Sequence, residues 1–128
     1  MSIDEFEILK ERSEKFLRNA EQLIDQEIYD LAAFNIQQSV ELYLKYKLLL
    51  SVGSYPKTHS IKRLLREIGK ATNKIDKVAR FIEENIDRIS NLENAYIMSR
   101  YYPSEFEKRE VENMLSVAKS IRKLVDEL

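Results

Sequence analysis

Only two glycines and two prolines occur in the 128 residues, and this scarcity constrains the fold more than any other feature. Average usage is ~7% glycine and ~5% proline. β-Sandwiches and barrels need many tight turns, and phosphate-binding loops need clustered glycines, so both are disfavoured. A chain that is 44% hydrophobic and 34% charged, with so few breakers, favours long amphipathic helices.

Hydrophobic residues recur at three- and four-residue steps, which is the period of an amphipathic helix. The pattern predicts helices at about 4–25, 28–51, 59–70, 74–98 and 104–128. The first break, in DQEIYD, contains neither glycine nor proline, so a single long helix is the alternative. We expect a break because acidic residues surround a change of register there.

Four of these helices have similar lengths, and the fifth is short. The sequence therefore predicts an all-α protein: an up-and-down four-helix bundle with one extra short helix at about 59–70, in the connection between the helices at 28–51 and 74–98. We expect a single domain over residues 1–128.

Capping residues and a glycine support the predicted helix boundaries. Thr58 or Ser60 can cap the short helix, and Gly69 lies where a C-terminal glycine is common. Ser104 and Glu107 have capping-box spacing, which predicts the start of the last helix.

The chain has no cysteine and one histidine, His59. Thiol chemistry, disulfides, zinc ribbons and iron–sulfur clusters are thereby excluded, and so is a multi-histidine metal site within one chain. We expect no cofactor. No apolar run approaches 18 residues and the acidic start MSIDEFE does not resemble a signal peptide, so we expect a cytoplasmic protein without a membrane segment.

Charge is unevenly distributed along the chain. Residues 45–80 carry ten basic and two acidic side chains, a balance of +8, whereas residues 1–44 have a balance of −6 and residues 81–128 a balance of −3. The basic block can attract a phosphate-bearing ligand. Alternatively, it lies against acidic neighbours in the same fold or in a partner.

Two short segments carry candidate binding residues. His59 and Lys62-Arg63 lie at the start of the short helix, where a helix N-terminus and basic side chains favour an anion. The alternative is a histidine that packs at the helix start and hydrogen-bonds locally.

In the second segment, Arg100 offers a planar fork for phosphate, and Tyr101 and Tyr102 offer stacking faces for a base. The alternative is that these tyrosines anchor a loop while Arg100 pairs with an acidic neighbour.

The predicted topology separates these two segments. In an up-and-down bundle Lys45, Lys47, His59 and Lys77 collect at one end, and Arg100 lies about 35 Å away. A shared site would need strongly tilted helices or a second subunit.

The sequence resembles the HEPN domain family over nearly its whole length. The residues that carry the resemblance are Ala32-Ala33-Phe34, Gln37-Gln38, Glu41, Leu44-Lys45, Gly53, Pro56, Thr58-His59, Leu64-Leu65, Ser99-Arg100-Tyr101 and Pro103. The resemblance implies a small helical bundle that forms homodimers. It also implies either pairing with a minimal nucleotidyltransferase, as in toxin–antitoxin systems, or nucleotide binding.

Ribonuclease members of that family carry an arginine followed, after four to six residues, by a histidine. If Arg100 is that arginine, the histidine should lie at 105–107, where the chain has Glu105, Phe106 and Glu107. No arginine at 52–54 pairs with His59 instead. No imidazole is thus placed to move a proton at the ribose 2′-hydroxyl, and we do not expect an enzyme.

We therefore expect a non-catalytic nucleotide- or nucleic-acid-binding protein that acts with a nucleotidyltransferase. Its expected site residues are Arg100, Tyr101, His59, Lys62, Arg63 and Lys45. Tyr46 and Tyr101 lie outside the main apolar stripes, which supports a homodimer. The alternatives are a metal-independent RNase with a degenerate site that uses His59, and a pure protein-interaction module.

Overall fold

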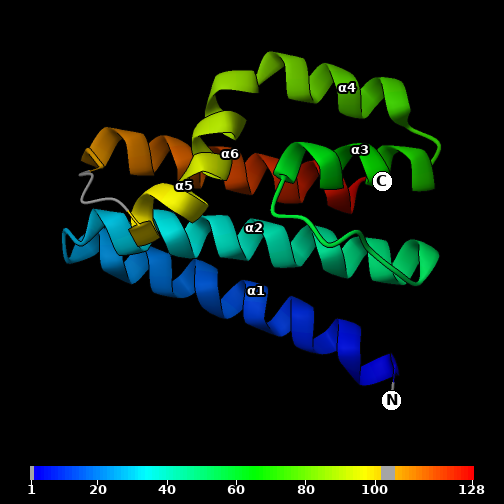
Figure 1. The fold of residues 1–128 in the computed structure, drawn as a ribbon, viewed down its shortest axis with the longest axis horizontal. Coiled ribbons are helices and arrows are strands. Elements are labelled where there is room, and N and C mark those ends of the chain that lie inside the picture. Colours follow the sequence, from blue (N-terminus) through cyan, green and yellow to red (C-terminus); the bar gives the residue numbers. More distant parts are fainter. Residues whose placement is uncertain (1, 102–105) are drawn as a thin grey trace.

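The computed structural model describes residues 2–101 and 106–128, and side chains within these ranges except those of residues 2–4 and 100. The described residues form an all-α bundle without strands (Figure 1). Its helices are α1 (Ser2–Asp25), α2 (Tyr29–Val52), α3 (Ile61–Ala71), α4 (Ile75–Glu84), α5 (Ile86–Tyr101) and α6 (Lys108–Asp126).

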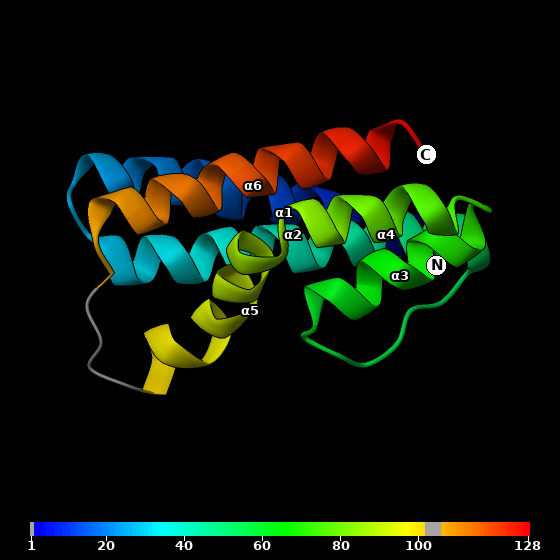
Figure 2. The same cartoon turned by 90° about the horizontal axis from the view of Figure 1, so that it is seen from above.

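Helices α1 and α2 form an antiparallel hairpin (Figures 1 and 2). The predicted break between them is confirmed: Glu27 takes a left-handed conformation with φ of 62°. Two buried serines fix the register of the pair. The Ser13 hydroxyl donates to the Ser39 carbonyl at 2.6 Å, and the Ser39 hydroxyl donates to the Ser13 carbonyl at 2.8 Å.

Helix α2 is the centre of the bundle, because α1, α3, α5 and α6 all pack against it. Its apolar stripe is buried at Ile36, Val40, Leu44 and Leu48. The stripe predicted for the last helix is also buried, at Val111, Met114, Ala118, Ile121 and Val125. Periodicity therefore identified the faces that meet in the core.

The predicted single helix at 74–98 is wrong, and with it the up-and-down four-helix arrangement. The chain breaks at Asn85, whose side-chain amide donates to the Phe81 carbonyl at 2.9 Å. Asparagine competes in this way for the carbonyls of the preceding turn, which favours a helix end. Helix α4 packs mainly on α3 and α5, while α5 leaves the bundle direction at a steep angle (Figure 2).

Of the two predictions for the ends of the short helix, one is confirmed and one is wrong. Ser60 caps α3, because its hydroxyl accepts from the Arg63 N–H at 3.2 Å. Gly69 does not end the helix, which continues to Ala71. A Cβ on Gly69 would lie 3.2 Å from Val78, so this glycine permits the close approach of α4.

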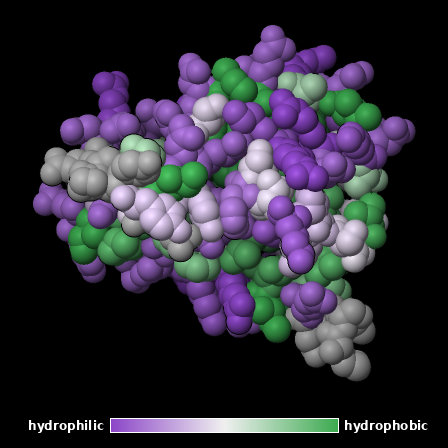
Figure 3. Space-filling model, viewed as in Figure 1, coloured by the Kyte–Doolittle hydropathy of each residue, from purple (hydrophilic) through white to green (hydrophobic). Residues whose placement is uncertain are grey.

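Helix α6 begins later than predicted. Its first turn is closed by the Glu110 carboxylate, which accepts from the Glu107 N–H at 2.9 Å. Ser104, the predicted cap, lies outside the described residues. No helix in the described part of the chain is both long and apolar enough to cross a membrane. The face shown in Figure 3 is mainly hydrophilic, with hydrophobic residues scattered over it.

Candidate functional site

A ladder of polar side chains runs along one side of α2. Gln37, Glu41 and Lys45 follow one another at four-residue steps, so they lie on one face of the helix. The Glu41 carboxylate, only 5% exposed, accepts from Gln37 Nε2 at 2.9 Å and from Lys45 Nζ at 2.9 Å. The Lys45 ammonium therefore offsets the charge of a carboxylate that is almost fully removed from water.

His59 completes this cluster from another segment. The connection between α2 and α3 runs back along α2 (Figure 1), and His59 Nδ1 lies 3.0 Å and 3.2 Å from the two Glu41 carboxylate oxygens. Since a carboxylate can only accept, Nδ1 carries the hydrogen. The His59 side chain remains 54% exposed.

Tyr96 of α5 covers one face of the His59 ring. The ring centroids are 3.9 Å apart and the planes are 19° from parallel. Behind it, Tyr96 also contacts Phe34 of α2, with centroids 6.4 Å apart. Three segments of the chain thus meet at one imidazole: the middle of α2, the loop before α3 and the second half of α5.

This contact overturns the expectation that His59 and Arg100 lie at opposite ends of the bundle. Arg100 follows Tyr96 by four residues in α5, which is about 6 Å along the helix axis. The expected separation assumed one straight helix over 74–98. The break at Asn85 lets α5 tilt across α2, which brings its C-terminal half to His59 (Figure 2). The Arg100 side chain lies outside the described residues.

The predicted anion site at the start of α3 is already filled by a carboxylate of the protein. Glu93 of α5 accepts from the Lys62 backbone N–H at 2.9 Å. The Lys62 side chain reaches α5 as well, because its Nζ donates to Ser90 Oγ at 2.9 Å. Lys62 therefore joins α3 to α5 through both its backbone and its ammonium group.

The other predicted residues differ in their surroundings. Arg63 is exposed on the first turn of α3, and Tyr101, at the end of α5, is 65% exposed. Lys45 is 12% exposed and lies 5.3 Å from the centroid of the Tyr55 ring. Lys77 is not part of this cluster, because its Nζ lies 3.6 Å from the carboxylate of Glu127, near the C-terminus.

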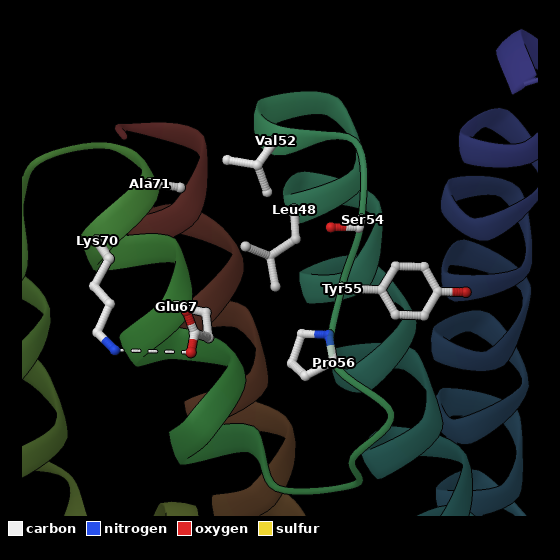
Figure 4. Close-up of a pocket in the computed structure, with 8 residues that line it drawn as sticks. All are labelled: Leu48, Val52, Ser54, Tyr55, Pro56, Glu67, Lys70 and Ala71. Atoms are coloured by element: carbon white, nitrogen blue, oxygen red, sulfur yellow. Dashed lines mark ion pairs between the residues drawn. The ribbon is translucent and has the colours of Figure 1, made fainter.

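A pocket of about 460 Å³ lies near the C-terminal end of α2 (Figure 4). Its lining residues are Leu48, Val52, Ser54, Tyr55, Pro56, Glu67, Lys70 and Ala71. Lys70 and Glu67 form an ion pair at 3.8 Å, and the Tyr55 ring points away from both (Figure 4). None of the predicted site residues lines this pocket, although Tyr55, which does, lies against Lys45 of the His59 cluster.

Sequence reasoning missed Glu41, Tyr96 and Glu93 as parts of the site. Glu41 could have been found from the sequence, because it adjoins the apolar stripe at Val40 and stands four residues from both Gln37 and Lys45. Tyr96 stands on the apolar stripe of the helix predicted at 74–98, which indicates a core residue, and no local pattern indicates that its ring would meet a loop more than 30 residues earlier.

In chemical terms, the cluster presents one edge of an imidazole to solvent. With Nδ1 held by Glu41, no described residue hydrogen-bonds to Nε2. Nε2 is therefore available to form a hydrogen bond with a ligand. No group of three or more potential metal ligands occurs among the described residues.

Comparisons with known proteins bear on the fold and the family of the chain. The family model described as the HEPN domain matches residues 6–128. The crystal structure of TT1696 from Thermus thermophilus has a similar fold, with a TM-score of 0.77. The two chains are 25% identical, and the match covers 95% of this chain and 96% of that one. No curated protein matches the sequence.

Proposed function

The chain belongs to the HEPN domain family, and we propose that it binds a nucleotide or nucleic acid without cleaving it. The proposed site, here called the His59 surface, consists of His59, Tyr96, Lys62 and Arg63. The observation that carries the proposal is the stacked and half-exposed His59 ring, because it stands beside the basic first turn of α3.

The charges around this ring support an anionic ligand. Glu41 is offset by Lys45, and the Glu93 carboxylate is offset by the N-terminus of α3, where it accepts from the Lys62 N–H. Arg63 and Arg66 are exposed on α3. Arginine guanidinium groups favour phosphate oxygens.

An RNase that uses His59 is the second candidate, and one observation favours it. A buried carboxylate orients Nδ1 and leaves Nε2 open, which is an arrangement that general bases use. Binding without cleavage is preferred because the positions expected to supply the family's catalytic histidine hold Glu105, Phe106 and Glu107.

The proposal includes two partners. A second copy of the chain would add an equivalent His59 surface, and a minimal nucleotidyltransferase would act with it. The family resemblance supports both, and exposed apolar side chains on α5, Ile97 and Tyr101, support the first.

A binding titration tests the proposal. A fluorescently labelled single-stranded RNA should bind at low salt, and the affinity should fall steeply as salt is added, since phosphate contacts release counterions. The double variant Arg63→Glu/Arg66→Glu should weaken binding at least tenfold. Both residues are exposed, whereas reversing Lys62 would break its hydrogen bond to Ser90.

Arg12→Glu/Arg18→Glu is the matched control, because it makes the same charge change on the exposed face of α1. It should change the affinity by less than the α3 variant. Equal loss in both variants would indicate nonspecific attraction. No binding of RNA or nucleotide to the wild-type protein at low salt would favour the protein-interaction module instead.

A further inference from the structure

The outward face of the His59 ring has the properties of a binding surface for one unpaired nucleobase. Resting on the proposed function, we infer that a base stacks on this face and that Nε2 contacts the edge of the same nucleotide. The ligand class is thus a nucleotide with an accessible base, either free or within a single strand.

Other side chains occupy one face and one edge of the His59 ring. Tyr96 covers one face at a centroid distance of 3.9 Å, and Glu41 occupies the Nδ1 edge at 3.0 Å. The side chain is nevertheless 54% exposed, and among the described residues no other ring stacks on His59, so we assign the open area to the opposite face and to the edge that carries Nε2. A planar ligand placed there would continue the stack of Tyr96 and His59.

The His59 ring is already fixed in place by its neighbours. Its Nδ1 is held by a carboxylate that Gln37 and Lys45 hold in turn, and Tyr96 is backed by Phe34. A base stacking on a fixed ring loses little affinity to the ordering of side chains. Base–aromatic stacking contributes about 1–3 kcal/mol per base, which corresponds to about 5- to 150-fold in affinity.

A nucleotide suits this surface better than another aromatic ligand does. Arg63 is exposed four residues after His59, on the first turn of α3. A ligand whose ring stacks on His59 can therefore carry a negative group toward a guanidinium. An aromatic side chain of a protein partner lacks that group, whereas a nucleotide has a ring and a phosphate in one molecule.

Because His59 is the single histidine of the chain, its ring protons give one distinct set of NMR signals. Two probes are titrated separately, adenosine 5′-monophosphate and ribose 5-phosphate, which share the sugar and phosphate but differ in the base. We expect adenosine 5′-monophosphate to shift the His59 ring signals upfield through the ring current of the base. Ribose 5-phosphate should shift the side-chain signals of Arg63 without this effect.

Substitutions then separate stacking from loop anchoring. His59→Ala should lower the affinity for adenosine 5′-monophosphate about 5- to 150-fold and change that for ribose 5-phosphate little. His59→Phe keeps an aromatic face and should retain most of the base preference. Lys57→Ala, exposed two residues earlier in the loop, is the control and should affect both probes alike.

The outcomes distinguish the inference from the function on which it rests. Equal binding of both probes, with no ring-current shift at His59, would overturn the stacking site and leave nucleotide binding in place. Absence of any shift with either probe or with single-stranded RNA would overturn both. Should His59→Ala lose its native amide spectrum, His59→Phe decides: loss of the base preference in a folded His59→Phe protein contradicts the inference.

Discussion

The Glu93 carboxylate of α5 lies at the N-terminus of α3, where it accepts a hydrogen bond from the Lys62 backbone N–H at 2.9 Å. Ser60 Oγ lies 3.5 Å from the same oxygen. An acidic side chain of the protein therefore satisfies a helix start that otherwise attracts external anions. This contact also holds α5 against α3 beside the His59 surface.

Replacing Glu93 should destabilise the fold. Glu93→Ala removes a charge-assisted hydrogen bond and a favourable helix-dipole contact, so we expect a loss of about 1–2 kcal/mol in the free energy of unfolding. Urea denaturation followed by circular dichroism measures it. Glu112→Ala, at an exposed position on α6, should cost less than about 0.5 kcal/mol. Equal effects of the two substitutions would show that the Glu93 contact contributes nothing.

Purified protein should leave single-stranded RNA intact during an overnight incubation. Glu105, Phe106 and Glu107 occupy the positions where a catalytic imidazole would be needed. Gel analysis of an end-labelled RNA checks this. Cleavage that co-purifies with the protein and disappears in both His59→Ala and Glu41→Gln would establish the RNase alternative.

Alkaline pH should weaken the fold through Tyr43. Burial and the hydrogen bond that its hydroxyl donates to Asp126 raise the pKa of Tyr43 from 10.0 to about 12. The folded protein therefore holds this proton more tightly than the unfolded chain does. The stabilisation is complete below pH 10 and is lost as the pH rises from 10 to 12, by on the order of 2 kcal/mol.

The Tyr43→Phe variant isolates this effect. It should be about 1 kcal/mol less stable than the wild type at pH 7, because the hydrogen bond is gone. Between about pH 9 and pH 11 its stability should decline less than that of the wild type, as measured by urea denaturation at each pH. Parallel pH curves for the two proteins would contradict the assignment.

Light scattering at micromolar concentration should give about 30 kDa, twice the chain mass of 15.2 kDa. Only one of the two tyrosines on which the sequence-based dimer prediction rested is exposed in the structure. Tyr46 is half-buried, packed between Phe6 and Tyr43 at centroid distances of 6.3 Å and 5.6 Å, so only Tyr101 of the two expected tyrosines is exposed.

Ile97 is 51% exposed on α5, and Ile97→Glu should shift the protein toward the monomer. Leu50→Glu, at a residue that is 49% exposed near the end of α2, is the control and should not. A wild-type mass of 15.2 kDa would rule out the dimer.

Periodicity predicted most of the buried faces, because burial of an apolar stripe is a local property of each helix. It was wrong for Ile75 and Ile86, which share the apolar stripe of the helix predicted at 74–98 but are 56% and 42% exposed. Ile36, Leu44, Ile61 and Ile121 stand on the apolar stripes of their helices, and all four are fully buried. The cap of α3 could also be predicted from the sequence, as Thr58 or Ser60, because the N–H that Ser60 caps belongs to Arg63, three residues away.

The angles between helices could not be predicted from the sequence. Asn85 stands within a continuous apolar pattern, so the sequence shows no change of face where α4 ends and α5 begins. The stack of His59 on Tyr96 depends on that angle and on the path of the loop along α2. Both are results of long-range packing, which a local pattern does not contain.

The peripheral position of α4 has a consequence for hydrogen exchange. Because α4 packs mainly on α3 and α5, and only Val78 and Ile82 are buried along its length, it can detach while the core around α2 stays closed. Its amides should therefore exchange with solvent sooner than those of α2. Extra residues inserted at the Asn73 turn should therefore be tolerated, because this turn joins α3 to the helix that detaches most easily.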